Sequence, residues 1–435
     1  MSEWYGSLPN GWETKRLKNF LSETKNTVGA NSADYTLLSL TKLGIIIRNM
    51  DGGGKFPADF GTYKIVDPGQ IIFCLFDVDE TPRTVGLSNY KGMITGAYNV
   101  FNIKNITPKF LEYYFIAIDN VKGLRPLYTG LRKVVTIDKF LQMHIPLPPL
   151  PEQDQIVRYL DWKVSQINKL INAKKKEIEL LKEQKQAVIN NAVTKGGEGW
   201  KEMSLGKLGS FRKGHGGSRT DDDENGVACI RYGDIYRTSA LILSKPITRI
   251  NKNATPPYAL IEKSEVLFAL SGETKTEIGQ AVVNNIDEIT YTSGDVAIFK
   301  SNGYIHPKFL VYAIRCPYLV QQRASAAKGD IIVHISASAL KSLKITMPVD
   351  YTEQKMIVYY LDKQSEIIDT AINNANRQIE LLQEYRTRLI SDVVTGKKDV
   401  RGIVVPEYET TEETVFAEIE NDNENENEQT TEQED

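Results

Sequence analysis

The chain has 435 residues, of which 41 % are hydrophobic and 25 % charged, a composition typical of a soluble globular protein of more than one domain. No apolar run approaches the roughly 20 residues that a membrane span needs, and no apolar stretch follows a basic N-terminus, so neither a membrane helix nor a signal peptide is predicted. Cys74, Cys229 and Cys316 are scattered, which predicts free thiols in a reducing, cytoplasmic compartment. The four histidines form no metal-spaced cluster with them, and no metal or cofactor is expected in this chain.

The net charge of −3 conceals a basic body. Residues 407–435 hold 13 Asp and Glu and no Lys or Arg, so setting those 13 charges aside leaves +10 for residues 1–406. A basic body suits a polyanionic partner such as double-stranded DNA. Residues 399–435 end in a low-complexity acidic stretch and are predicted to form a disordered tail.

Residues 1–150 are predicted to form a first globular domain that mixes short strands with a helix. Apolar and β-branched runs bounded by Gly, Pro and Asp predict the strands, and a proline at the first turn predicts a helix over residues 108–118. The predicted strands cover residues 36–40, 70–74 and 97–102.

The chain then enters a long helix that occurs twice. Residues 152–194 and 353–395 align at a constant offset of 201, with no insertion or deletion. In both copies the apolar residues recur in alternating steps of three and four, a heptad pattern that predicts a narrow apolar seam against a partner helix. The predicted helical segments are residues 151–196 and 352–398.

Residues 197–351 are predicted to form a second globular domain that repeats the first. The motif PKFL at residues 108–111 returns unchanged at residues 307–310. The offset varies within the globular parts because loops can differ in length, whereas it is constant in the helices. The corresponding strands are predicted at residues 227–232, 266–270 and 296–300, and the helix at residues 307–314.

The predicted fold class is α+β, with two tandem α/β domains separated by a pair of long helices that form an antiparallel coiled coil with pseudo-twofold symmetry. A compact second domain would return the chain to the side where the first helix ends, so the helices run antiparallel and their seams can meet. Each 43-residue repeat helix spans roughly 64 Å at about 1.5 Å per residue. Paired helices of fixed length would therefore set the spacing between two divergent domains.

This layout resembles the specificity subunit of type I restriction–modification enzymes. The resemblance rests on the doubled arrangement and on two connectors, IPLPPLPEQDQIVRYLD at residues 145–161 and the weaker ITMPVDYTEQKMIVYYLD at residues 345–362. It implies a non-catalytic subunit whose two target-recognition domains each read one half of a bipartite DNA site. It also implies that two modification subunits dock on the helices and methylate adenine with S-adenosylmethionine, and that motor-nuclease restriction subunits complete the complex. The acidic tail departs from the family pattern.

Basic and aromatic residues in Gly-rich loops are the candidates for DNA contact, because arginine can pair bidentately with guanine and lysine neutralises phosphate. Residues 130–133 and 327–330 place basic residues at equivalent positions of the two repeats and are the best pointer. For any one candidate, a solvated surface charge is the alternative. The candidates are Lys42, Arg48, Lys55, Arg83, Arg125, Arg132, Lys133, Arg212, Lys213, His215, Arg219, Arg231, Tyr232, Arg237, Lys275, Arg323 and Lys328.

Other functions leave weaker traces in the sequence. Residues 254–258 approach the Asn/Asp-Pro-Pro-aromatic motif of amino-methyltransferases, but Thr255 lacks the amide or carboxylate that the motif requires. Glu273 and Lys275 are faintly similar to a nuclease Glu-x-Lys, with Glu262 or Glu265 as the earlier acid. No P-loop spacing is present. A coiled-coil scaffold that binds only proteins is the alternative to DNA recognition, and it predicts no salt-dependent DNA affinity.

Overall fold

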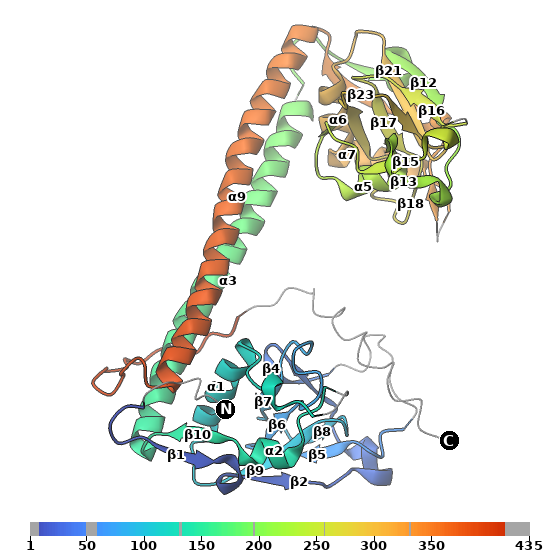
Figure 1. Ribbon diagram of the computed structural model, residues 1–435. Coiled ribbons are helices and arrows are strands. Elements are labelled where there is room, and N and C mark those ends of the chain that lie inside the picture. The colour runs from blue at the N-terminus through green and yellow to red at the C-terminus, as the bar shows by residue number, and fades with distance from the viewer. Residues whose placement is uncertain are drawn as a thin grey trace, which may run out of the picture. The chain divides into compact units, whose positions relative to one another are not determined.

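The computed structural model describes residues 8–48, 59–129, 133–194, 196–255, 257–329 and 332–413 (Figure 1). The chain forms two compact units. The first combines residues 1–176 with residues 376–435, and the second comprises residues 177–375. Each unit therefore contains one globular part together with a portion of each of two long helices.

The globular part of the first unit contains a four-stranded antiparallel sheet of order β2-β9-β6-β7, together with the two-stranded sheets β1-β10, β3-β4 and β5-β8. Its core includes a cluster of Phe73, Phe101, Phe115 and Phe140, each at most 1 % exposed, in which the Phe73 and Phe115 rings meet edge to face at 4.8 Å. The elements are β1 (Glu13–Arg16), β2 (Leu21–Thr24), β3 (Leu38–Thr41), β4 (Gly44–Ile47), β5 (Lys64–Val66), β6 (Ile71–Phe73), β7 (Val85–Leu87), β8 (Gly92–Ile94), β9 (Asn99–Ile103), α1 (Pro108–Asn120), α2 (Ile137–Gln142) and β10 (His144–Leu147).

The globular part of the second unit repeats this plan with larger sheets. A five-stranded sheet of order β12-β21-β17-β19-β14 lies beside a four-stranded sheet of order β15-β13-β20-β16, and β11-β23 and β18-β22 form separate pairs. Its elements are β11 (Trp200–Ser204), α4 (Leu205–Leu208), β12 (Gly209–Lys213), β13 (Asp222–Ile230), α5 (Tyr232–Arg237), β14 (Ile242–Leu243), β15 (Thr248–Ile250), β16 (Ala259–Ile261), β17 (Val266–Ala269), β18 (Ser271–Gly272), β19 (Ala281–Asn284), β20 (Thr290–Thr292), β21 (Val296–Ser301), α6 (Pro307–Ile314), α7 (Pro317–Ala326), β22 (Val333–His334), α8 (Ala337–Ser342) and β23 (Lys344–Pro348).

Most predicted elements are confirmed to within two or three residues, and the helix predicted at residues 307–314 coincides with α6. The strand predicted at residues 227–232 is wrong at its end. β13 stops at Ile230 and α5 begins at Tyr232. The cause is a helix cap, because the Asp234 carboxylate accepts a hydrogen bond from the Arg231 backbone N–H at 2.8 Å.

The two predicted long helices are α3 (Leu150–Thr194) and α9 (Tyr351–Val394). In the first unit, Ile156 and Leu160 near the start of α3 share a core with Leu389 and Val393 near the end of α9. In the second unit the end of α3 shares a core with the start of α9, through residues that include Val188, Val193, Val358 and Leu361. Within each unit the helices therefore pair antiparallel along the predicted seams, which confirms the α+β fold class with paired long helices.

Each globular part is fixed to the helix that follows it by the same contacts. Trp12 Nε1 donates to Glu152 Oε1 at 2.9 Å, and Trp200 Nε1 donates to Glu353 Oε1 at 2.9 Å. The tyrosine hydroxyls of α1 and α6 repeat this equivalence, with Tyr113 donating to Asp161 at 2.6 Å and Tyr312 donating to Asp362 at 2.7 Å. The internal duplication thus extends to individual hydrogen bonds.

The prediction of a disordered tail from residue 399 is wrong for its first part. Residues 399–413 make a turn at residues 401–402 and otherwise form neither helix nor strand, and side chains of α3 and α9 hold them. Gly396, which follows α9, has φ +75°, and a Cβ there would lie 2.3 Å from Pro9 Cγ, so glycine suits both the turn and the close approach. Among the described residues no helix is long and apolar enough to cross a membrane, and no group of three metal-binding side chains occurs.

Candidate nucleic-acid interface

Three loops of the second unit meet where β17 ends, and we name their described residues, 213–218, 271–277, 328–329 and 332–334, the second-unit loop cluster. Ser271 and Gly272 pair with His334 and Val333 in the β18-β22 ladder. Lys328 and His334 exchange backbone hydrogen bonds of 2.9 and 2.8 Å. The Gly294 N–H donates to the Gly216 carbonyl at 2.8 Å, which holds the first loop beside the segment that precedes β21.

Ser271 is the side chain that joins these segments. Its hydroxyl donates to Asp295 Oδ1 at 3.1 Å and lies 3.0 Å from His334 Nδ1, and the residue is 6 % exposed. Because the hydroxyl proton is directed at Asp295, the Ser271 oxygen can accept from His334 Nδ1. Asp295 and His334 are exposed, so this network ties a buried hydroxyl to two surface side chains and holds the loops together.

Four of the predicted DNA contacts come together on this cluster. Lys213, His215, Lys275 and Lys328 are all exposed, although they lie as much as 115 positions apart in the sequence. Glu273 and Glu277 are exposed on the same loops, so the surface is mixed in charge. Such a surface can present cations to phosphates and polar side chains to base edges.

The first of these loops is supported from beneath by Tyr258, which is 7 % exposed. Its hydroxyl donates to Asp221 Oδ2 at 2.8 Å and accepts from the Ser218 N–H at 3.2 Å. Burial and the hydrogen bond to Asp221 raise the pKa of Tyr258. Arg231 completes the support by donating to the Ser218 carbonyl at 2.7 Å and pairing with Asp222 at 2.6 Å. The Arg231 side chain is only 14 % exposed, so we assign it to holding the loop in position and not to the predicted DNA contact.

The remaining predicted residues of the second unit divide by burial. Arg323 is corrected, because it is 2 % exposed and donates to the backbone carbonyls of Glu277 and Ile278, where it cannot reach a phosphate. Burial lowers the pKa of its guanidinium to about 10. Arg212 pairs with Glu265 at 2.6 Å. The other three are Tyr232, which packs on the core; Arg237, which is exposed at the end of α5; and Arg219, whose side chain lies outside the described residues.

The first unit contains the same frame in equivalent positions. Phe76 forms a β-bridge with Val134, and the Val135 N–H donates to the Leu75 carbonyl at 2.7 Å. In the second unit the Ile335 N–H donates to the Leu270 carbonyl at 3.0 Å. We name the described residues of these loops, 77–84, 129 and 133–135, the first-unit loop pair.

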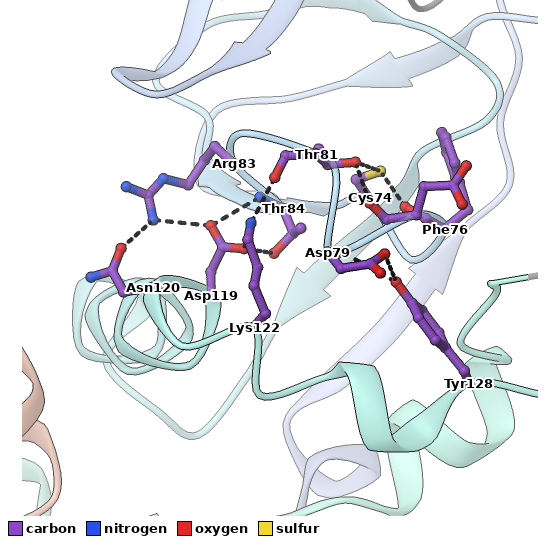
Figure 2. Close-up of polar contacts among 11 residues, drawn as sticks. Cys74, Phe76, Asp79, Thr81, Arg83, Thr84, Asp119, Asn120, Lys122 and Tyr128 are labelled. Carbon is purple, nitrogen blue, oxygen red and sulfur yellow. Dashed lines mark hydrogen bonds and ion pairs between the residues drawn. The ribbon is translucent and has the colours of Figure 1, made fainter.

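The loop pair of the first unit places two carboxylates beside its predicted cation, Lys133. Lys133 pairs with Asp79 at 3.6 Å and with Glu80, and the hydrogen bond to Glu80 raises the pKa of Lys133. Tyr128 donates to Asp79 at 2.6 Å, and burial together with this bond raises the pKa of the phenol to about 12 (Figure 2). The predicted cation Lys133 is therefore largely balanced by neighbouring carboxylates.

A buried carboxylate ties this loop to α1. Asp119, 3 % exposed, accepts from the Thr84 hydroxyl at 2.8 Å and forms ion pairs of 3.1 Å with Arg83 and Lys122 (Figure 2). Arg83 also donates to Asn120 at 3.2 Å, and its side chain is 17 % exposed. Arg83 is thus bound within the unit, and this structural role replaces the predicted surface position.

The other first-unit candidates lie elsewhere or outside the described residues. Lys42 is exposed in the turn between β3 and β4, Arg48 is half-buried just after β4, and Arg125 is exposed. Lys55 and Arg132 fall outside the described residues. No observation tests any individual DNA contact, so the exposed candidates stay predictions.

Several residues that shape the loops were not identified from sequence. Asp119, Tyr128, Ser271 and His334 belong to no motif, and Tyr258 belongs only to the methyltransferase-like stretch, because each acts on the loops through a partner at least 35 positions away. The only available signal was the equivalent placement of the 130–133 and 327–330 loops, which did locate one loop in each unit.

The sequence traces of other activities find no support in the geometry. Tyr258, the aromatic residue of the methyltransferase-like stretch, is used beneath a loop. Glu265 precedes β17 and pairs with Arg212, whereas Glu273 follows β18, so the two acids of the nuclease-like pattern lie at opposite ends of the β17–β18 stretch.

Comparison with known proteins gives a consistent family. The type I restriction modification DNA specificity domain matches residues 75–180 and 197–381. The MjaVIII type I restriction enzyme specificity subunit of Methanocaldococcus jannaschii is 26 % identical over 91 % of this chain and 95 % of its own length. A putative MjaX specificity subunit from the same organism is 22 % identical over 91 % of this chain and 96 % of its own.

Solved structures show the same fold. A chain from a study of complex assembly and conformational transition in the type I restriction–modification system superposes with a TM-score of 0.68 at 17 % identity, covering 90 % of this chain and all of that one. The HsdS subunit from Thermoanaerobacter tengcongensis gives a TM-score of 0.54 at 17 % identity, covering 92 % of this chain and all of that one.

Proposed function

This chain belongs to the type I restriction–modification DNA specificity family, and from that premise we propose that the second-unit loop cluster and the first-unit loop pair each read one half of a bipartite DNA site. The observation that carries the proposal is the shared backbone frame of the two sets of loops, which present different charged side chains at equivalent positions. Divergent side chains on one frame are what two recognition modules for two sequences require.

The partners follow from the same premise. We infer that two modification subunits dock on α3 and α9, bind S-adenosylmethionine and methylate adenine, and that motor-nuclease restriction subunits join them. The specificity chain itself contributes no catalysis in this proposal. In support, Thr255 replaces the amide or carboxylate of the methyltransferase motif, and Glu265 and Glu273 are held apart.

The decisive test is a map of N6-methyladenine in cells that carry the partner subunits, with and without this chain. We expect a split motif that disappears when the chain is absent. A hybrid in which residues 1–150 are exchanged for those of a relative should alter one half of the motif and leave the other half and the gap unchanged.

Two outcomes would contradict the proposal. A hybrid that alters both halves would show that the units are not independent readers. A complex that binds DNA with no dependence on salt concentration, or not at all, would favour the protein-only scaffold.

A further inference from the structure

The C-terminal residues 399–413, which we name the strap, are seated on the helices of the first unit. Val400 is 2 % exposed and joins the first-unit core, with Ile403 and Val405 packed against it. Gln155 of α3 donates through Nε2 to the Val400 carbonyl at 3.0 Å and to the Ile403 carbonyl at 2.6 Å. The strap is thus anchored by apolar burial at its beginning.

Further along the strap, side chains of α3 form hydrogen bonds with its backbone. Ser165 Oγ donates to the Glu409 carbonyl at 3.0 Å and accepts from the Thr411 N–H at 2.7 Å. Asn168 and Asn172 donate to the carbonyls of Thr411 and Glu412 at 3.0 and 2.8 Å. Ser165, Asn168 and Asn172 follow one another at steps of three and four, so they lie along one face of the helix.

The last described residue of the strap joins the two helices. The Glu413 carboxylate pairs with Lys175 of α3 at 2.9 Å and with Arg386 of α9 at 2.7 Å, and Gln383 of α9 donates to it at 3.2 Å. Its side chain is 13 % exposed, and those of Lys175 and Arg386 are 20 % and 24 % exposed. A half-buried carboxylate between two cations acts as a clamp across the helix pair.

In the second unit, a direct ion pair between the two helices occupies the position that corresponds to this clamp. There Lys185 of α3 pairs directly with Asp369 of α9 at 2.7 Å. At the repeat offset of 201, Lys185 corresponds to Arg386 and Asp369 to Asn168. Arg386 does donate to Asn168 Oδ1 at 2.6 Å, but the asparagine carries no charge.

We propose that the strap is a built-in ligand that fastens α3 to α9 in the first unit, where Glu413 supplies the carboxylate that Asp369 supplies from α9 in the second. The strap also covers a helix face that is open in the other unit. Ser165, which the strap contacts, is 4 % exposed, whereas its repeat equivalent Glu366 is exposed. The inference does not depend on what the loops bind.

Cysteine labelling of the full chain tests whether the strap is seated. The three native cysteines are at most 1 % exposed, so they provide a silent background. Ser165, 4 % exposed beneath the strap, and its exposed repeat equivalent Glu366 form a matched pair of positions. We expect Ser165→Cys to react with a maleimide at least about tenfold more slowly than Glu366→Cys, because the strap covers position 165. One charge-assisted contact that holds the strap closed corresponds to about that factor.

Adding Glu413→Gln should raise the rate of Ser165→Cys about tenfold and leave Glu366→Cys unchanged, because only the first unit depends on the clamp. Equal rates at the two positions in the otherwise native chain would overturn the proposal. So would a slow rate at Ser165→Cys that Glu413→Gln does not change, because the carboxylate would then not hold the strap.

A compensating substitution distinguishes two effects of the strap: fastening α3 to α9, and covering the face of α3 around Ser165. Asn168→Asp places on α3 the carboxylate that the repeat pattern lacks, opposite Arg386. In the Glu413→Gln chain we expect faster hydrogen exchange in residues 376–394, restored by Asn168→Asp, while Ser165→Cys stays reactive. Asp369→Asn should accelerate exchange in residues 351–375 whether or not the strap is intact. Failure of Asn168→Asp to restore protection would show that the missing charge is not what the strap provides.

Discussion

The two loop frames differ most in how they are held and in the charge they present. In the first unit the 77–84 loop is tied down by a buried anion, Asp119, and presents Asp79 and Glu80. In the second unit the 271–277 loop is tied down by the Ser271 hydroxyl and presents Lys275 together with Glu273 and Glu277, while the neighbouring loop presents Lys328.

This difference shows that backbone frame and surface chemistry are specified separately. The bridge between Phe76 and Val134 and the ladder between β18 and β22 keep the loops at the same place in each unit. These contacts join backbone atoms, so the described side chains on the loops can differ between the units without loss of the frame.

The largest expected effect is that of Asp119→Ala. Removal of the carboxylate leaves Arg83 and Lys122 without their anion, which costs about 3–5 kcal/mol when one partner of a buried pair is lost. Urea unfolding of the variant should show this loss of the free energy of unfolding. Asp287→Ala, at a side chain 90 % exposed, is the control and should change it by less than about 0.5 kcal/mol.

Ser271→Ala should have a smaller effect in the second unit, because a neutral hydroxyl is lost and no ion is left unpaired. We expect about 0.5–1.5 kcal/mol from the lost hydrogen bonds, because the partners Asp295 and His334 are exposed and can bond to water instead. Ser338→Ala, at an exposed serine of α8, is the matched control. If Ser271→Ala lowers the free energy of unfolding as much as Asp119→Ala does, then the ion pairs of the first frame and the neutral hydroxyl of the second contribute equally, and the proposed difference between the frames is wrong.

Lys328→Ala should weaken DNA binding by the partner complex at all sequences. Loss of one phosphate contact lowers the slope of log affinity against log salt concentration by about one. Lys133→Ala should lower it less, because Asp79 and Glu80 already balance that charge. Lys263→Ala serves as a control, since Lys263 lies before β17, at the other end of that strand from the loops. Identical slopes for Lys328→Ala and Lys263→Ala would show that Lys328 is a solvated surface charge that does not contact DNA.

The smallest effect concerns pH and the helix pair. Burial favours the neutral acid, but hydrogen bonds from Lys175 and Arg386 outweigh it and lower the pKa of Glu413 below 4.5. A lowered folded-state pKa gives stability that is present above the unfolded-state pKa and is lost as the pH falls through the folded-state pKa. The difference in unfolding free energy between the native chain and Glu413→Gln should therefore shrink as the pH falls below the ordinary glutamate pKa and vanish only below the lowered folded-state pKa. A difference in unfolding free energy that persists in acid would show that the effect of Glu413→Gln comes from side-chain packing and not from the charge.

The sequence by itself determined the architecture. A gap-free repeat with heptad spacing predicted α3 to within two residues and α9 to within four, since helix periodicity is a local property that each segment displays independently. The doubled motif PKFL located both globular parts, and the equivalent loops at 130–133 and 327–330 marked one place in each where the loops meet.

Only the tertiary structure decided which charges are available and which are used internally. Arg323 and Lys328 lie five positions apart and look alike in sequence, yet one is buried against carbonyls and the other is exposed. The acidic C-terminus predicted disorder, yet Glu413 finds its partners on helix positions 27 and 238 residues away. The physical reason is that the free energy of a charge depends on the dielectric and the partners around it, and these are set by contacts between segments that no local pattern encodes.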